Sequence, residues 1–112
     1  MVQALRQAGA IVERHADHFT KGTPDETWLA RAGSRNWVVL TRDKRIRYRQ
    51  LEKLALTEAK VRAFVFTGGN VTVKDTAAIL VGALPRIDRV CRTQAGPFIY
   101  HIGLAGKPHR VA

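Results

Sequence analysis

Two apolar runs in the middle of the chain predict buried strands of a parallel sheet. Residues 37–41 and 61–67 are nearly continuous in apolar side chains, which is typical of strands that are covered on both faces. Between them, apolar residues recur at the i, i+3 and i+4 spacing of an amphipathic helix from about residue 47 to 59. A strand, a helix and a strand in this order predict a right-handed crossover connection.

The first third of the chain carries two helix signals. Residues 1–8 place apolar positions at helical spacing and end before Gly9, which predicts the last turns of a helix, and residues 10–14 follow as a short strand. Residues 23–26 combine a capping threonine, a proline in the first helical position and a carboxylate three residues after the cap. This combination predicts a second helix, which ends at Gly33.

The last third predicts a long helix and a final strand. Residues 68–70 form a glycine-rich turn, and the helix after it carries one apolar stripe, made up of Ala77, Leu80, Leu84, Ile87 and Cys91. Pro85 falls inside this helix, and because proline has no backbone N–H we expect it to kink or split the helix. Aromatic and β-branched residues favour a strand over 98–104.

Together these elements predict a single α/β domain. At 112 residues the chain is large enough for one hydrophobic core but not for two. We expect the domain to span residues 1–105 and residues 106–112 to form a loose, basic tail.

Charge and apolar length narrow the choice of partners. Nineteen Lys and Arg residues against nine acidic ones give a net charge of +10. Such a charge favours RNA, DNA or an acidic protein as a partner. The alternative is that the charge only keeps the protein in solution. The longest apolar stretch, around residues 77–84, is too short to span a bilayer, and the start of the chain lacks a signal-peptide layout. No membrane association is expected, and the cytoplasm is the default location.

Cys91 is the single cysteine, which excludes an internal disulfide or a zinc cluster of thiolates.

The strongest candidate for chemistry is Asp43, directly after the predicted strand 37–41. Ligand sites of open α/β folds gather at the carboxyl ends of their parallel strands, and the turn at Gly68 and Gly69 should lie at the same edge. That glycine pair could cradle a phosphate or form a plain turn. Two or three carboxylates at such an edge can bind Mg²⁺ or Mn²⁺, and a water acidified by the metal can attack a phosphodiester.

Asp25 and Glu26 stand at the start of a helix, where carboxylates are favoured with or without chemistry. Glu26 is largely explained by the capping pattern. Asp25 is less fully explained, which makes it the better second metal ligand, with the role of a cap residue as its alternative.

A basic run surrounds Asp43. Its members are Arg42, Lys44, Arg45, Arg47 and Arg49, with Tyr48 interleaved. The run could hold a nucleic-acid backbone while Tyr48 stacks on a base, or it could be a solvated loop and helix start with Tyr48 in the core. His15, Asp17 and His18 fit no standard zinc spacing and favour a polar loop, with Asp17 as a reserve carboxylate.

Three segments carry a family resemblance: residues 22–29 (GTPDETWL), 37–47 (WVVLTRDKRIR) and 67–70 (TGGN). In this order they resemble the PIN-like domains of the VapC type, found among bacterial toxin–antitoxin ribonucleases, over roughly residues 1–105. The resemblance implies a three-layer α/β/α fold with a mostly parallel central sheet and metal-dependent cleavage of RNA, often restrained by an antitoxin. It assigns Asp43, Asp25 and the substitute Glu26 to the Mg²⁺ or Mn²⁺ ion. Thr41 would orient water or the neighbouring carboxylate.

The chain departs from this family at its beginning. Family members open with a central strand that ends in an acidic residue, and this chain keeps only the tail of the helix that follows. Either a longer protein is made or the chain is a remnant, and we favour the first explanation. The expected partners are RNA and an antitoxin protein, with a homodimer left open. The acidic residue of that central strand would be the principal metal ligand, so the predicted function is a metal-dependent endoribonuclease if the upstream acidic strand exists. The alternative is a catalytically incomplete module that binds RNA or an antitoxin without cleaving. A third possibility is a fragment that does not fold alone.

Overall fold

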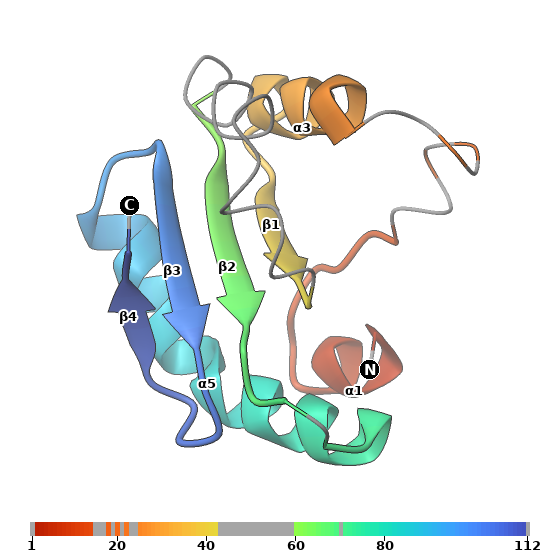
Figure 1. Ribbon diagram of the computed structural model, residues 1–112, viewed down its shortest axis with the longest axis vertical. Coiled ribbons are helices and arrows are strands. Elements are labelled where there is room, and N and C mark those ends of the chain that lie inside the picture. The colour runs from red at the N-terminus through yellow and green to blue at the C-terminus, as the bar shows by residue number, and fades with distance from the viewer. Residues whose placement is uncertain are drawn as a thin grey trace.

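The computed structural model describes residues 2–14, 18, 20, 22, 25–42, 60–69 and 71–111. These residues form a mixed α/β fold with a four-stranded, mostly parallel sheet (Figure 1). The helices are α1 (Val2–Gln7), α3 (Asp25–Ser34) and α5 (Val73–Thr93). The strands are β1 (Val38–Thr41), β2 (Arg62–Phe66), β3 (Phe98–Ile102) and β4 (Pro108–Arg110).

The sheet has the strand order β1-β2-β3-β4. β1 pairs with β2 and β2 with β3 in parallel, so that Val39 lies opposite Ala63 and Ala63 opposite Ile99. β4 adds an antiparallel edge next to β3. The two strands predicted from the apolar runs are therefore confirmed, together with their parallel arrangement.

Each face of the sheet carries its own core. Ala63 and Val65 of β2 pack with Leu29 and Ala32 of α3 on one face. The alternate residues of β2, Phe64 and Phe66, lie in a second cluster on the opposite face, built from Leu5, Leu80, Ala83, Phe98, Tyr100 and Ile102. Because helices cover both faces, the strands are apolar at nearly every position, which is why the sequence shows continuous runs instead of alternation.

The helix ends match the sequence in part. α1 stops at Gln7, and Gly9 adopts a φ of 96°, a conformation that favours glycine, as the predicted stop requires. α3 does not end at Gly33: it runs to Ser34, and the chain turns at Asn36, whose φ is 57°. The N–H of Trp37 then donates to the carbonyl of Ala32 at 2.9 Å, which closes the turn into β1.

Of the two effects predicted for Pro85, a kink or a split, the split does not occur. The helix is continuous from Val73 to Thr93 and begins at Thr72, whose side chain accepts a hydrogen bond from the N–H of Asp75 at 3.0 Å. Proline in a helix interior costs one backbone hydrogen bond and some crowding. Burial of Leu80 and Ala83 against the sheet offsets that cost.

Two predictions about the chain ends are wrong. The segment 106–112 is not a loose tail, because β4 lies within it and the N–H of Val111 donates to the carbonyl of Ile99 at 2.9 Å. Residues 10–14 are described but form no strand, since no strand lies beside them in the described part of the chain. The predicted helix 47–59 lies outside the described residues. No described helix is long and apolar enough to cross a membrane.

Candidate active site at the carboxyl edge of the sheet

The parallel pairing of β1 and β2 brings the ends of both strands to one edge of the sheet. β1 ends at Thr41, and Phe66, the last residue of β2, is followed by Thr67 and the glycines 68–69. The N–H of Thr67 donates to the carbonyl of Ile102 at 2.9 Å, which ties this turn to the end of β3. The sequence prediction that the two segments share one edge is thus confirmed.

Arg42 is the described member of the basic run. Its side chain is exposed, and its guanidinium carbon lies 5.8 Å from the centre of the Phe66 ring. A cation over an aromatic face within about 6 Å is attracted by the ring. This contact holds a positive charge at the carboxyl edge of the sheet, where an anion such as a phosphodiester could bind.

Gly68 has a packing reason for being glycine. A Cβ atom at this position would lie 2.8 Å from Cε1 of Phe66 and would overlap Cζ of the same ring. Phe66 is almost completely buried, so the ring cannot swing away into solvent. Gly69 follows with a φ of 75°, so it serves as a turn residue. Of the two alternatives for the glycine pair, the described contacts favour the plain turn.

The carboxylates of the predicted metal site are placed only along the backbone. Asp25 and Glu26 form the first turn of α3, and their side chains lie outside the described part of the structure. Asp43 lies outside the described residues, two positions after the end of β1. The same holds for the rest of the basic run, namely Lys44, Arg45, Arg47, Tyr48 and Arg49.

The residue types nevertheless fit a hard divalent cation. Carboxylate and hydroxyl oxygens are the donors that Mg²⁺ and Mn²⁺ prefer, and the structure places the Thr41 hydroxyl side chain, partly exposed, at the edge from which the chain leads to Asp43. Within the described ranges, no three His, Cys, Asp or Glu residues gather into a metal-binding group.

His18 has structural contacts. Its Nε2 lies 3.2 Å from a carboxylate oxygen of Glu13, and its ring centre lies 4.9 Å from that of Trp37. His18 itself has helical backbone geometry, so the prediction of a polar loop is not confirmed at this position. His15 and Asp17 lie outside the described residues.

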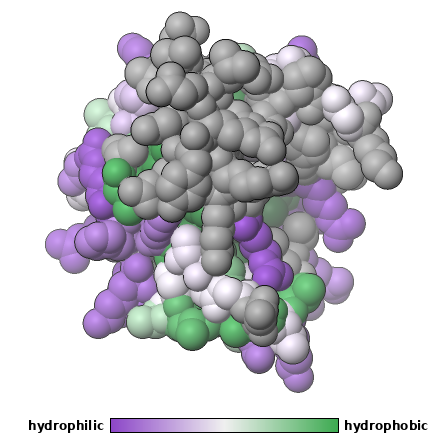
Figure 2. All heavy atoms as spheres, viewed as in Figure 1, coloured by the Kyte–Doolittle hydropathy of each residue, from purple (hydrophilic) through white to green (hydrophobic). Residues whose placement is uncertain are grey.

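The surface charge is spread widely. Figure 2 shows hydrophilic residues along both sides of the molecule in this view. The exposed basic residues occur on every described helix and on several turns; they include Arg6, Arg31, Arg35, Lys60, Lys74, Arg86, Arg89, Arg92, Lys107 and Arg110. The basic character of the chain is therefore not confined to residues 42–49.

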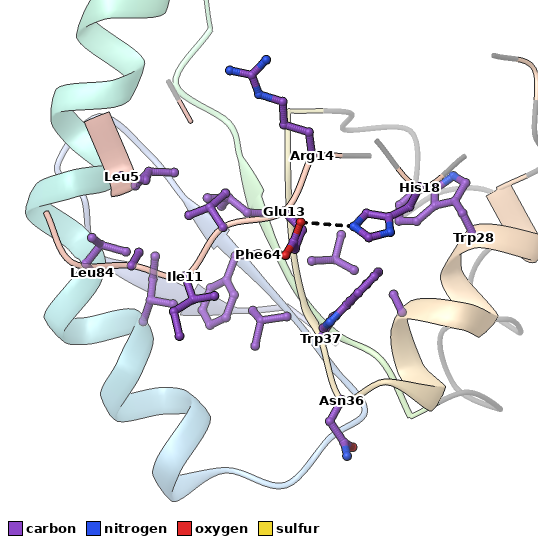
Figure 3. Close-up of a pocket in the computed structure, with 17 residues that line it drawn as sticks. Leu5, Ile11, Glu13, Arg14, His18, Trp28, Asn36, Trp37, Phe64 and Leu84 are labelled. Atoms are coloured by element: carbon purple, nitrogen blue, oxygen red, sulfur yellow. Dashed lines mark hydrogen bonds and ion pairs between the residues drawn. The ribbon is translucent and has the colours of Figure 1, made fainter. Parts of the chain in front are cut away.

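Sequence reasoning missed a cleft beside β1. It has a volume of about 590 Å³, and its lining comes from residues 5–14, α3, β1 and α5 (Figure 3). Trp28 and Trp37 stand on one side of it and Leu5 and Leu84 on the other. No local signal could have revealed this cleft, because its walls come from segments far apart in the chain.

Comparison with known protein families gives one match. The family described as PIN like domain matches residues 1–68, a range that contains α1, α3, β1 and β2. Comparisons with curated protein sequences and with solved structures returned no significant match.

Proposed function

We propose that this chain, which belongs to the PIN-like domain family, cleaves RNA with the help of a divalent metal ion at the carboxyl edge of its sheet. One observation supports this most: the family match spans both parallel strands whose ends meet at this edge, including Thr41 and the Asp43 that follows. A carboxylate beside a basic run is suited to phosphodiester chemistry, because the acid can hold a cation and the bases can hold the strand.

The proposed metal site gives each residue a separate role. Asp43 and Asp25 would hold Mg²⁺ or Mn²⁺ together with an acidic residue upstream in the longer protein, with Glu26 as a substitute for Asp25. When bound, the metal acidifies a water molecule so that it can attack phosphorus. Thr41 would orient that water or the neighbouring carboxylate through its hydroxyl group.

The RNA strand would be held by the basic run. Arg42, kept at the edge by its contact with Phe66, would bind a phosphate next to the cut site. The remaining cations of the run would follow the backbone, and Tyr48 would stack on a base; the cations are Lys44, Arg45, Arg47 and Arg49.

The decisive experiment compares RNA cleavage after removal of the Asp43 carboxylate and after removal of a control carboxylate. The Asp43→Asn variant and the unchanged protein are incubated with single-stranded RNA in Mn²⁺, in Mg²⁺ and in EDTA. We expect cleavage only by the unchanged protein with metal, with a loss of at least about a hundredfold in the variant. Asp88→Asn is the matched control, because Asp88 is an exposed acid on α5 whose carboxylate lies 3.0 Å from the Arg92 guanidinium. Equal cleavage by the Asp43 and Asp88 variants would contradict the proposed role.

The same experiment separates the alternative function. RNA binding that persists in EDTA, with no cleavage under any metal condition, would identify a binding module that does not cleave. Filter binding and gel analysis of the same samples give both readouts.

The VapC-type resemblance adds a finer proposal: cleavage in the cell is toxic, and an antitoxin protein restrains it. Induced expression of the unchanged protein should then arrest bacterial growth, whereas the Asp43→Asn variant should not. Normal growth with a protein that cleaves RNA in solution would contradict the toxin role and leave the ribonuclease proposal intact.

A further inference from the structure

Exposed apolar residues lie at the carboxyl edge of the sheet, outside the residues assigned to cleavage. Leu104 is 60% exposed and lies in the turn between β3 and β4. Val73 is 62% exposed and starts α5, after the turn that follows β2. Figure 2 shows hydrophobic atoms beside hydrophilic ones at the end of the molecule where β2 and β3 end in Figure 1. Apolar surface beside a proposed substrate site is a candidate part of that site.

The Leu104 side chain is held against the turn after β2. A Cβ atom at Gly68 would lie 3.0 Å from Cδ2 of Leu104, so the leucine lies against the bare backbone of the glycine. The hydrogen bond from the N–H of Thr67 to the carbonyl of Ile102, at 2.9 Å, joins the two segments that carry these residues. The leucine side chain therefore lies over the edge of the sheet, next to the end of β2.

The turn that carries Leu104 is fixed by its own hydrogen bond and by packing. The N–H of Gly106 donates to the carbonyl of Gly103 at 3.0 Å, and Gly106 is buried with a φ of 69°. A Cβ atom at Gly106 would lie 3.5 Å from the carbonyl oxygen of Ile79 and 3.9 Å from Cβ of Ala83, so the turn packs against α5. A side chain on a turn that is already ordered loses little conformational entropy when a ligand binds.

The Phe66 ring links Leu104 to the cation at this edge. A Cβ atom at Gly68 would contact both Leu104 and Phe66, and the guanidinium carbon of Arg42 lies 5.8 Å from the centre of the same ring. An exposed cation and an exposed apolar side chain are therefore neighbours of one buried ring. Single-stranded RNA is complementary to this combination, because its phosphates are anionic and the faces of its unstacked bases are available for apolar contact.

The other charges in the two turns also favour an anionic ligand. Lys74 follows Val73, Lys107 lies in the segment after Leu104, and both lysines are exposed. Asp75, an exposed acid, lies in the first turn of α5. Together with Arg42, the described cations of this edge outnumber the described acid, so the local field attracts phosphate.

We propose that Leu104 and the Gly68 backbone form a subsite for one unpaired RNA base, next to the phosphate that Arg42 binds. The subsite rests on the proposed function and adds to it a residue that contacts a base of the substrate. A base inside a duplex has its faces covered by its stacked neighbours, so the substrate is single-stranded where it meets Leu104.

The test is a scan of a short RNA from which one base is removed at a time. An oligoadenylate of about six nucleotides, within the usual site size of proteins that bind single strands, is compared with versions that each contain one abasic position. Fluorescence anisotropy measures binding to the full chain in EDTA, so that no strand is cut. For the unchanged protein, removal of the base at the subsite should weaken binding about fivefold, at the lower end of the range for base stacking. The Leu104→Ser variant should bind this abasic strand and the complete strand equally well.

Two further variants separate contact with the base from other effects. Ile11→Ser is the matched control, because isoleucine is an isomer of leucine and Ile11 is 99% exposed, but it lies with Leu84 in the lining of the cleft beside β1 (Figure 3). This variant should keep the full dependence on the base. Leu104→Phe enlarges the apolar face and should strengthen binding of the complete strand but not of the abasic one. The replaced side chains are exposed, so the variants should stay folded, which circular dichroism checks.

Four results would overturn the proposal. They are the absence of saturable RNA binding, identical scans for Leu104→Ser and the unchanged protein, an equal loss of base dependence in the Ile11 variant, and a loss in Leu104→Ser that is the same for complete and abasic strands.

RNA cleavage is a separate readout from this scan. Metal-dependent cleavage together with a scan that does not depend on Leu104 would remove the subsite and keep the ribonuclease proposal. A scan that depends on Leu104 without cleavage under any metal condition would support the subsite and contradict the ribonuclease proposal.

Discussion

At the scale of single residues, the contact between Gly68 and Phe66 links the candidate site to the core. Phe66 supports Arg42 from beneath and at the same time fills the space that a side chain at position 68 would need. The identity of Gly68 therefore follows from packing and does not require a bound phosphate.

Gly68→Ala should destabilise the fold by about 1–3 kcal/mol, because overpacking a filled core forces a buried ring to shift. Urea unfolding followed by tryptophan fluorescence measures the loss. Gly82→Ala is the control. A Cβ at position 82 meets nothing within 4 Å, and alanine is a better helix former than glycine inside α5, so this variant should be as stable as the unchanged protein or more stable. Equal stability of the Gly68 variant and the unchanged protein would contradict this assignment.

Cys91 provides a second prediction at this scale. Burial raises the pKa of the Cys91 thiol, the charge of Arg62 lowers it in part, and that of Asp88 raises it again. A raised pKa means that less thiolate is present at any given pH, and thiolate is the reactive form. Alkylation by iodoacetamide should therefore be slower than that of a small free thiol at pH 8 and should reach half its maximal rate at a higher pH. Urea should restore the ordinary rate, and equal rates in the folded and unfolded protein would contradict the prediction.

At the scale of elements, local patterns identified those that bury apolar residues on a face. The continuous apolar run around Val39 and the apolar stripe containing Leu80 are visible in the sequence and indicate which residues are buried. Both elements were predicted close to their observed limits. β4 was missed, because its three residues, Pro108–Arg110, are polar or break strands and pair only because β3 offers an edge. Residues 10–14 show the opposite error, since strand preference without a neighbour produces no strand.

The contribution of β4 can be measured by removing it. A chain that ends at residue 106 loses the pairing with β3 and the packing of Val111 against the core beneath α3. With net contributions of about 0.5–1.5 kcal/mol for each hydrogen bond, we expect a loss of about 2–3 kcal/mol in the free energy of unfolding. Arg110→Ala in the full chain is the control, because it removes a side chain and keeps the backbone pairing. If the truncated chain were as stable as this control, β4 would contribute nothing measurable to the free energy of unfolding, and the prediction would be wrong.

At the scale of the whole molecule, the candidate site was only partly open to prediction. Parallel strands bring Thr41 and Gly68 to one edge whatever the details of packing, so the position of the site followed from strand order alone. The cleft beside β1 depends on how α1, α3 and α5 stand relative to one another, which no local pattern encodes. For the same reason, the basic run predicted an RNA-binding position but not the exposed cations that lie on other elements.

Positive charge is spread over the whole described surface, so the net charge does not show which cations contact RNA. The salt dependence of RNA binding can show this, because it reports the number of phosphate contacts. Each phosphate contact to a single strand contributes a slope of about −0.7 to the dependence of log K on log salt concentration. Arg42→Ala should weaken binding and make that slope about 0.7 shallower, because Arg42 lies at the carboxyl edge where the strand is proposed to bind. Arg89→Ala is matched in charge and exposure but lies in the second half of α5, which leads away from that edge toward the start of β3. Its slope should stay within error of the unchanged protein. Equal changes in the two variants would mean that RNA is held by the overall field of the molecule and not by this edge of the sheet, whereas a change confined to Arg42 would place the bound phosphate beside the end of β1.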